Sequence, residues 1–174
     1  IKCYIIIIII IFKYLIYLMG VQMKQRVIEL TEFGKAENMR LIEAEIPSPG
    51  PGQIVVKNKA IGLNYLDTYF RSGLYPWPNQ EKIKIPGSEG VGFVHAVGSN
   101  VVELKEGDKV SYVTPVGAYA EYALITAVHA VQIKVDVNDF DVVACTLKGL
   151  TAHYLLHLTF DLKSGMTALV HAAA

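Results

Sequence analysis

From Met23 onward the chain is built of short apolar runs that glycine and proline repeatedly interrupt. Runs of this length, rich in β-branched residues and bounded by turn-forming residues, are typical of β-strands. A helix requires a longer stretch with apolar residues at helical spacing, and only one long stretch of that kind is present. The pattern therefore predicts a domain that is mostly β.

Six runs are predicted to be strands: Arg26–Leu30, Met39–Glu45, Ile54–Ala60, Ile85–Gly98, Val110–Val113 and Tyr119–Ile125. The first two flank the turn residues Phe33-Gly34-Lys35, which indicates a hairpin. The segment Pro47–Gln53 is expected to be a loop, because its prolines have no N–H to donate to a ladder. The glycines within Ile85–Gly98 indicate a bent strand that another backbone approaches closely, rather than a dinucleotide fingerprint.

Two helices and a last strand complete the expected elements. A short helix is predicted over Asn64–Ser72, with Asn64 as its N-cap and Gly73 ending it. A long helix is predicted over Asp139–Leu158, where apolar residues recur at helical spacing. The apolar run Thr167–Ala174 is typical of a buried strand.

Residues 1–22 form a separate, strongly apolar segment. Lys13 divides the segment into runs shorter than the ~20 residues of a spanning helix, which weakens a membrane-anchor interpretation without removing it. A signal peptide is a second interpretation, although no clean cleavage site follows the apolar run. We favour a third: a low-complexity extension that lies upstream of a natural start at Met23 and takes no part in the fold.

Charge and cysteine content narrow the class of protein. Sixteen basic residues balance sixteen acidic ones, so no strong field is present to attract nucleic acid or an anionic membrane. Cys3 and Cys145 lie far apart, which argues against a disulfide framework. We therefore expect a cytoplasmic protein with a small-molecule or protein partner and no nucleic-acid role, and a membrane role is not favoured.

Several runs together resemble a known family: AIGLNYLDTYFRSGLYP from Ala60, IPGSEGVGFVHAVGSNV from Ile85, LKEGDKV from Leu104, GAYAEY from Gly117 and LKGLTAHYLL from Leu147. In order and spacing they resemble the medium-chain dehydrogenase/reductase superfamily, and within it the zinc-free, zeta-crystallin-like quinone oxidoreductase branch. The resemblance covers the N-terminal part of that family only. The terminal ALVHAAA resembles the first strand of its Rossmann domain.

The resemblance implies an architecture in two parts. Residues 23–146 are expected to form a GroES-like partial β-barrel on the substrate side. Residues 147–174 are expected to be the linking helix and the first strand of an incomplete nucleotide-binding Rossmann domain. A homodimer is expected for a full-length form.

The residues at the zinc positions predict a metal-free site. Where the zinc alcohol dehydrogenases of this superfamily have Cys and His, this chain has Asn64 and Ser88, and neither is a customary zinc ligand. The pair His153 and His157 lies on one helix face, but two imidazoles without further ligands favour a structural role.

The resemblance also implies which residues face the nicotinamide and the substrate. Expected cofactor-binding residues are Asn64, Tyr69, Lys148 and Thr151, and expected substrate-binding residues are Tyr65 and Tyr75. Helix capping by Asn64 and core packing by Tyr69 stay open as alternatives. Asp67 is expected to orient either the backbone or Arg71 rather than to contact substrate, and of the two we favour an ion pair with Arg71. No residue is assigned as catalytic, because hydride transfer is the chemistry of the cofactor itself.

The implied activity is the NADPH-dependent reduction of quinones by hydride transfer without a metal, in a full-length form. The choice between NADPH and NADH is left open, because the residues that discriminate them lie in the absent part of the nucleotide-binding domain. One alternative is a truncated, non-catalytic fragment that pairs with other chains. Another is a reductase of enoyl thioesters or related conjugated carbonyls with the same fold.

Overall fold

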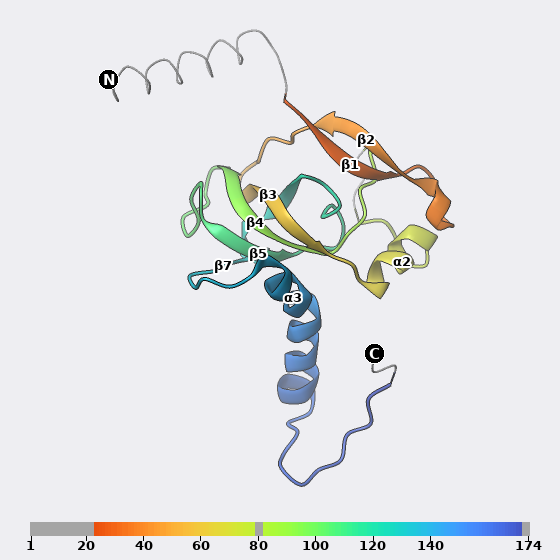
Figure 1. The fold of residues 1–174 in the computed structure, drawn as a ribbon, viewed down its shortest axis with the longest axis vertical. Helices are drawn as coiled ribbons and strands as arrows, with labels where there is room; N and C mark the ends of the chain where they lie inside the picture. Colours follow the sequence, from red (N-terminus) through yellow and green to blue (C-terminus); the bar gives the residue numbers. More distant parts are fainter. Residues whose placement is uncertain (1–22, 79–81, 172–174) are drawn as a thin grey trace.

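The computed structural model describes residues 23–78 and 82–171, which form two antiparallel sheets (Figure 1). The smaller sheet pairs β1 (Lys24–Leu30) with β2 (Met39–Glu45). The larger sheet has the strand order β6-β3-β4-β5-β7. Its strands are β3 (Gln53–Gly62), β4 (Glu89–Val97), β5 (Lys109–Val113), β6 (Tyr122–Thr126) and β7 (Ala130–Gln132). The prediction of a mostly β domain with an N-terminal hairpin is confirmed.

Two strands begin later than their apolar runs suggested. β4 begins at Glu89 rather than Ile85, because Pro86 has no N–H to donate and Gly87 adopts a positive φ of 95°. β6 begins at Tyr122 rather than Tyr119. Residues before Tyr122 turn towards the hairpin instead, where Ala120 forms an isolated bridge with Val27 of β1.

That bridge ties the small sheet to the large one. The Ile28 N–H donates to the Tyr119 carbonyl at 2.9 Å, and Arg26 Nη2 lies 2.7 Å from Glu121 Oε1. Hydrogen bonds from Arg26 also lower the pKa of the Glu121 carboxyl. The hairpin is therefore held against the segment that precedes β6.

The main core lies within the large sheet. It consists of buried apolar side chains contributed by the strands and the loops between them: Ile54, Val56, Val94, Leu104, Val110, Tyr112, Ala118, Ala123 and Ile125. A second, smaller cluster joins Ala60 of β3 and Val91 of β4 to Val143. Burial of this cluster fastens the long helix to the sheet.

Gly92 lies where the backbones of β3 and β4 approach closely. Opposite it the register of β3 and β4 shifts between Asn58 and Ala60. A Cβ on Gly92 would lie 2.1 Å from the Lys57 carbonyl oxygen, a distance that no side chain tolerates. The interpretation of this glycine as a backbone requirement is confirmed.

Two helices follow strands of the large sheet. α2 (Tyr65–Ser72) comes after β3, with Asn64 as its N-cap and Gly73 in the left-handed conformation at its end. α3 (Asp139–His153) starts at the Asn138 cap and passes into a π-helical turn, Tyr154–Thr159. Its first half packs on the sheet, and its second half projects away from it (Figure 1). Short 3₁₀ turns lie at Ala36–Asn38 and Ala127–His129.

The predicted last strand is wrong over the part of it that the structure describes. Residues 167–171 carry no strand hydrogen bonding, and no strand of the described residues lies beside them to pair with. A single extended segment cannot satisfy its own backbone groups, so apolar composition alone does not make it a strand. The anchor, signal and extension interpretations of residues 1–22 lie outside the described residues, as does Cys3.

Within residues 23–78 and 82–171, none of the helices combines the length and the apolar character needed to span a bilayer. Cys145 has a free thiol in this part of the chain.

We predict that Gly92→Ala destabilises the fold strongly, by about 1–3 kcal/mol or more, because the new methyl group meets a fixed carbonyl. The control is Gly149→Ala on α3, where the nearest atom to a new Cβ is 4.0 Å away. That substitution should stabilise the protein by about 0.5–1 kcal/mol, as alanine replaces glycine in a helix. Urea unfolding followed by circular dichroism measures both. Equal effects of the two substitutions would contradict the assignment.

Candidate functional site

A cleft of about 460 Å³ lies between the start of α2 and the middle of α3. Its walls comprise Asn64, Tyr65 and Leu66 on one side and Leu147, Lys148, Thr151, Ala152 and Leu155 on the other. Four of the six residues predicted to bind cofactor or substrate line it: Asn64, Tyr65, Lys148 and Thr151. Segments separated by more than 80 positions thus meet at one place.

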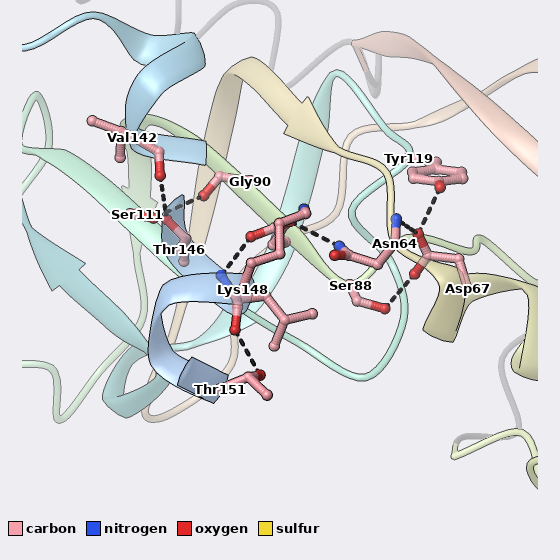
Figure 2. A network of polar contacts seen from close by, with 12 residues as sticks. Asn64, Asp67, Ser88, Gly90, Ser111, Tyr119, Val142, Thr146, Lys148 and Thr151 are labelled. Carbon is pink, nitrogen blue, oxygen red and sulfur yellow. Dashed lines mark hydrogen bonds and ion pairs between the residues drawn. The ribbon is translucent and has the colours of Figure 1, made fainter. Parts of the chain in front are cut away.

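Glu89, the first residue of β4, connects the two walls. It is fully buried, with no exposed surface. Its Oε1 accepts from the Asn64 amide at 2.8 Å and from Lys148 Nζ at 2.6 Å, and its Oε2 accepts from the Leu147 N–H at 2.7 Å. Figure 2 shows the labelled side chains of Asn64 and Lys148 on the two sides of this network. A buried carboxylate requires such compensation, so the contacts fix the separation of the cleft walls.

Asp67 holds the first turn of α2 in place through three hydrogen bonds. Its Oδ2 accepts from the Asn64 N–H at 2.9 Å and from the Tyr119 hydroxyl at 2.7 Å, and its Oδ1 accepts from Ser88 Oγ (Figure 2). Burial, followed by the hydrogen bond to Asp67, raises the pKa of Tyr119. Tyr119 therefore stays protonated and keeps donating to Asp67 at physiological pH.

The expected ion pair between Asp67 and Arg71 is wrong. Asp67 bonds instead to the three donors just described, and the Arg71 Nε is buried without a hydrogen-bond partner. Three hydrogen bonds, one from the Asn64 backbone and two from the hydroxyls of Ser88 and Tyr119, compensate the carboxylate. They require less ordering of side chains than a long arginine would.

Tyr65, Tyr69 and Tyr75 form a row of rings beside the cleft. The Tyr65 and Tyr69 ring centroids lie 5.4 Å apart in an edge arrangement, and those of Tyr69 and Tyr75 lie 5.3 Å apart. Only Tyr65 lines the cleft itself. Tyr69 and Tyr75, the other two predicted residues, do not line the cleft. They pack in a row behind Tyr65 and position its exposed ring.

Lys148 and Thr151 differ in how they are held. Lys148 is not simply solvated: its side chain is 50% exposed, and its amine pairs with the buried Glu89. The Thr151 hydroxyl donates to the Leu147 carbonyl at 2.8 Å, which leaves its oxygen lone pairs available as acceptors.

No group of three or more potential metal ligands occurs in the described ranges 23–78 and 82–171. His153 and His157 lie with ring centroids 5.0 Å apart and exposed to solvent. His95 packs its ring against Tyr122, with centroids 4.9 Å apart.

Sequence reasoning missed Glu89 and Tyr119, the two residues that organise the site with Asp67. A signal for Glu89 was present, because it is a lone charged residue in the glycine-rich, otherwise apolar start of a strand. A charge in such a place needs a partner. No local signal marks Tyr119, whose hydroxyl meets α2 only through the tertiary fold.

We predict that Lys148→Met destabilises the protein by about 1–3 kcal/mol, because it leaves the buried Glu89 carboxylate with one donor and one counter-charge fewer. The value is set below the usual cost of breaking a fully buried pair, since Lys148 is half exposed. Urea unfolding measures the change.

The matched control is Lys163→Met, which removes a lysine from an ion pair with Asp161 whose side chains are 63% and 62% exposed. Its effect should stay within about 0.5 kcal/mol. If the two substitutions lower the free energy of unfolding equally, the burial of Glu89 does not depend on Lys148.

Parts of the chain are similar to known proteins. Residues 50–135 match the model of the alcohol dehydrogenase GroES-like domain. The chain is 43% identical to a quinone oxidoreductase of Pseudomonas aeruginosa, over 84% of this chain and 45% of that protein. It is 38% identical to a 2-haloacrylate reductase of a Burkholderia species, over 81% of this chain and 44% of that protein.

Among solved structures, the fold is similar to the quinone oxidoreductase of Escherichia coli complexed with NADPH. The TM-score is 0.71 at 36% identity, over 81% of this chain and 42% of that one. The chain therefore spans somewhat less than half the length of the relatives that it matches.

Proposed function

We propose that this chain, whose residues 50–135 match the alcohol dehydrogenase GroES-like domain, supplies the substrate-side part of a metal-free, NADPH-dependent quinone oxidoreductase. The proposed reaction is hydride transfer to a quinone in a form that also contains the rest of a nucleotide-binding domain. The likeness to quinone oxidoreductases at 43% identity supports the proposal.

The single observation that carries the proposal is the shared cleft. Asn64, Tyr65, Lys148 and Thr151 come from two distant segments, and all four line it. A cleft with aromatic and aliphatic walls and a few convergent polar groups is the usual form of a site for a flat organic ligand.

The cleft residues fit the nicotinamide end of the proposed cofactor. The Thr151 hydroxyl has free lone pairs that can accept from a carboxamide N–H₂. The exposed Tyr65 ring and the apolar side chains of Leu147 and Leu155 offer a surface for a planar ring. Bound NADPH would supply the hydride.

The residues of this chain would then bind and orient. Asn64 has one amide N–H committed to Glu89, and we propose that its second N–H donates to an oxygen of the acceptor. Lys148, held by Glu89, would place a positive charge beside the oxygen on which negative charge develops during reduction. The tyrosine row, with Tyr69 and Tyr75 behind Tyr65, would line the acceptor side and exclude water.

Absence of a catalytic metal is part of the proposal. The Asn64 amide is occupied by Glu89 and the Ser88 hydroxyl by Asp67. Both side chains therefore already have structural partners, and neither belongs to the thiolate, imidazole and carboxylate groups that bind zinc.

Reduction of other conjugated carbonyl compounds is a second candidate function. The observation that favours it is the 38% identity to a 2-haloacrylate reductase, an enzyme named for a substrate that is a conjugated acid rather than a quinone. Both functions would use the same cleft. A homodimer of the full-length form and a cytoplasmic location stay predictions, as does the division of the chain at residue 147.

We predict that the 174-residue chain binds NADPH weakly and through its nicotinamide end. Saturation-transfer difference NMR should show strong transfer to the nicotinamide protons and little to the adenine protons. Thr151→Ala should reduce this transfer several-fold, because a carboxamide contact is lost, at a cost of about 1 kcal/mol.

Thr159→Ala is the control, since Thr159 lies on the π-helical turn outside the residues that line the cleft. Transfer spread evenly over both ends of NADPH, or unchanged by Thr151→Ala, would refute the proposed cofactor contact. Tight binding would contradict the alternative of a non-catalytic fragment.

A further inference from the structure

A second cavity, of about 390 Å³, is lined by residues of α2, β2 and the loop that carries Tyr119. Besides Asn64, Tyr65 and Asp67 it is lined by Met39, Leu63, Thr68, Arg71, Pro86 and Tyr119. Its volume lies within the range of about 300–1,000 Å³ that small-molecule sites occupy. The lining is largely apolar, with a single positive charge.

That charge is Arg71, which forms no ion pair within residues 23–78 and 82–171. The other arginines, Arg26 and Arg40, form ion pairs with Glu121 and Glu29 at 2.7 and 3.0 Å. Arg71 forms none with any described residue, and its Nε is buried without a hydrogen-bond partner. A guanidinium is always charged, so a buried N–H left without an acceptor costs free energy.

The carboxylate nearest in sequence is not available to it. Asp67 lines the same cavity one helical turn earlier, but its oxygens accept from Asn64, Ser88 and Tyr119. Because burial and Asp67 raise the pKa of Tyr119, that hydroxyl does not release its bond to Asp67 at physiological pH. The cavity is therefore lined by a guanidinium N–H that has no acceptor among the described residues.

We propose that this cavity, which we call the Arg71 cavity, is a binding site for a small carboxylate with an apolar body, whose oxygens accept hydrogen bonds from the Arg71 guanidinium. The planar fork of the guanidinium matches the two oxygens of a carboxylate. Met39, Leu63 and Pro86 would contact the apolar body of the ligand. The Thr68 hydroxyl already donates to the Tyr65 carbonyl at 2.6 Å. It therefore has no hydrogen to give to the carboxylate, and Arg71 is the donor on which binding depends.

This site does not depend on the proposed redox function. It rests on the Arg71 cavity and the unpaired guanidinium, and it binds its ligand without cofactor or turnover. A failure of quinone reduction would leave it intact, and its own failure would leave the cleft between α2 and α3 intact.

The test is a ¹H–¹⁵N NMR titration of the 174-residue chain with trans-cinnamate and, separately, with the neutral cinnamamide. Cinnamate should shift the amide resonances of residues 68–73 and of Tyr119, and should bind about tenfold or more tightly than the amide, as expected for a charge-assisted contact. Equal affinities for the two probes would overturn the proposal without any mutation being needed.

Two variants test whether Arg71 itself binds the carboxylate. Arg71→Gln should weaken cinnamate binding about tenfold, to the level of cinnamamide, and Arg71→Lys should recover part of it, because the charge returns without the fork. Arg40→Gln is the control, since Arg40 is exposed and does not line the cavity. Unchanged binding by Arg71→Gln, or an equal loss in Arg40→Gln, would overturn the assignment.

Inorganic phosphate provides the last arm of the test. It should compete weakly, because it has no apolar body to fill the cavity. Competition by phosphate at the same concentration as cinnamate would overturn the assignment of a carboxylate ligand.

Discussion

The buried carboxylate of Glu89 is the constraint on which the candidate site depends. It has no exposed surface, so each of its oxygens must be compensated by protein donors. Those donors are the Asn64 amide from the start of α2 and, from α3, the Leu147 N–H and the Lys148 amine. The same compensation that makes burial tolerable also sets where the two helices lie.

The carboxylate also dictates the backbone around it. A side chain at Gly62 would place its Cβ 2.2 Å from Glu89 Oε1, so the end of β3 must be glycine for the carboxylate to fit. The helix side is secured separately, by Val143 against Ala60 and Val91 and by the Thr146 hydroxyl, which lies 2.6 Å from Ser111 Oγ. Apolar burial thus holds α3 against the sheet, and the polar contacts fix its position along and around its axis.

Local signals predicted the elements of the fold well and its tertiary contacts poorly. The N-terminal hairpin, the loop before β3 and the ends of α2 all follow from turn and cap residues that act within a few positions. The prediction of a strand over residues 167–171 is wrong because strand formation depends on a neighbouring strand, which no local pattern reveals.

In the candidate site, too, local patterns identified single residues but not the contacts between them. Asn64 and Lys148 were identified through motifs, whereas their common partner Glu89 and the donor Tyr119 join the site only through contacts across the fold. The Asp67 partner was misjudged because helical spacing suggested Arg71, while Ser88 and Tyr119 approach from other segments.

The two buried carboxylates have distinct roles, and this separation explains how the cleft can be formed before any ligand arrives. Asp67 fixes the first turn of α2 to the loops that carry Ser88 and Tyr119, through donors that involve no charged side chain. Glu89 then joins that turn to α3 with a charged donor. Because each wall is held by the interior rather than by the other wall's surface side chains, a ligand that enters the cleft does not have to order it. Binding free energy that would otherwise be lost in ordering is retained as affinity. Lys148 is the exception: its amine bonds to Glu89, but its side chain is 50% exposed. The remaining N–H groups of the amine are therefore available to a molecule bound in the cleft.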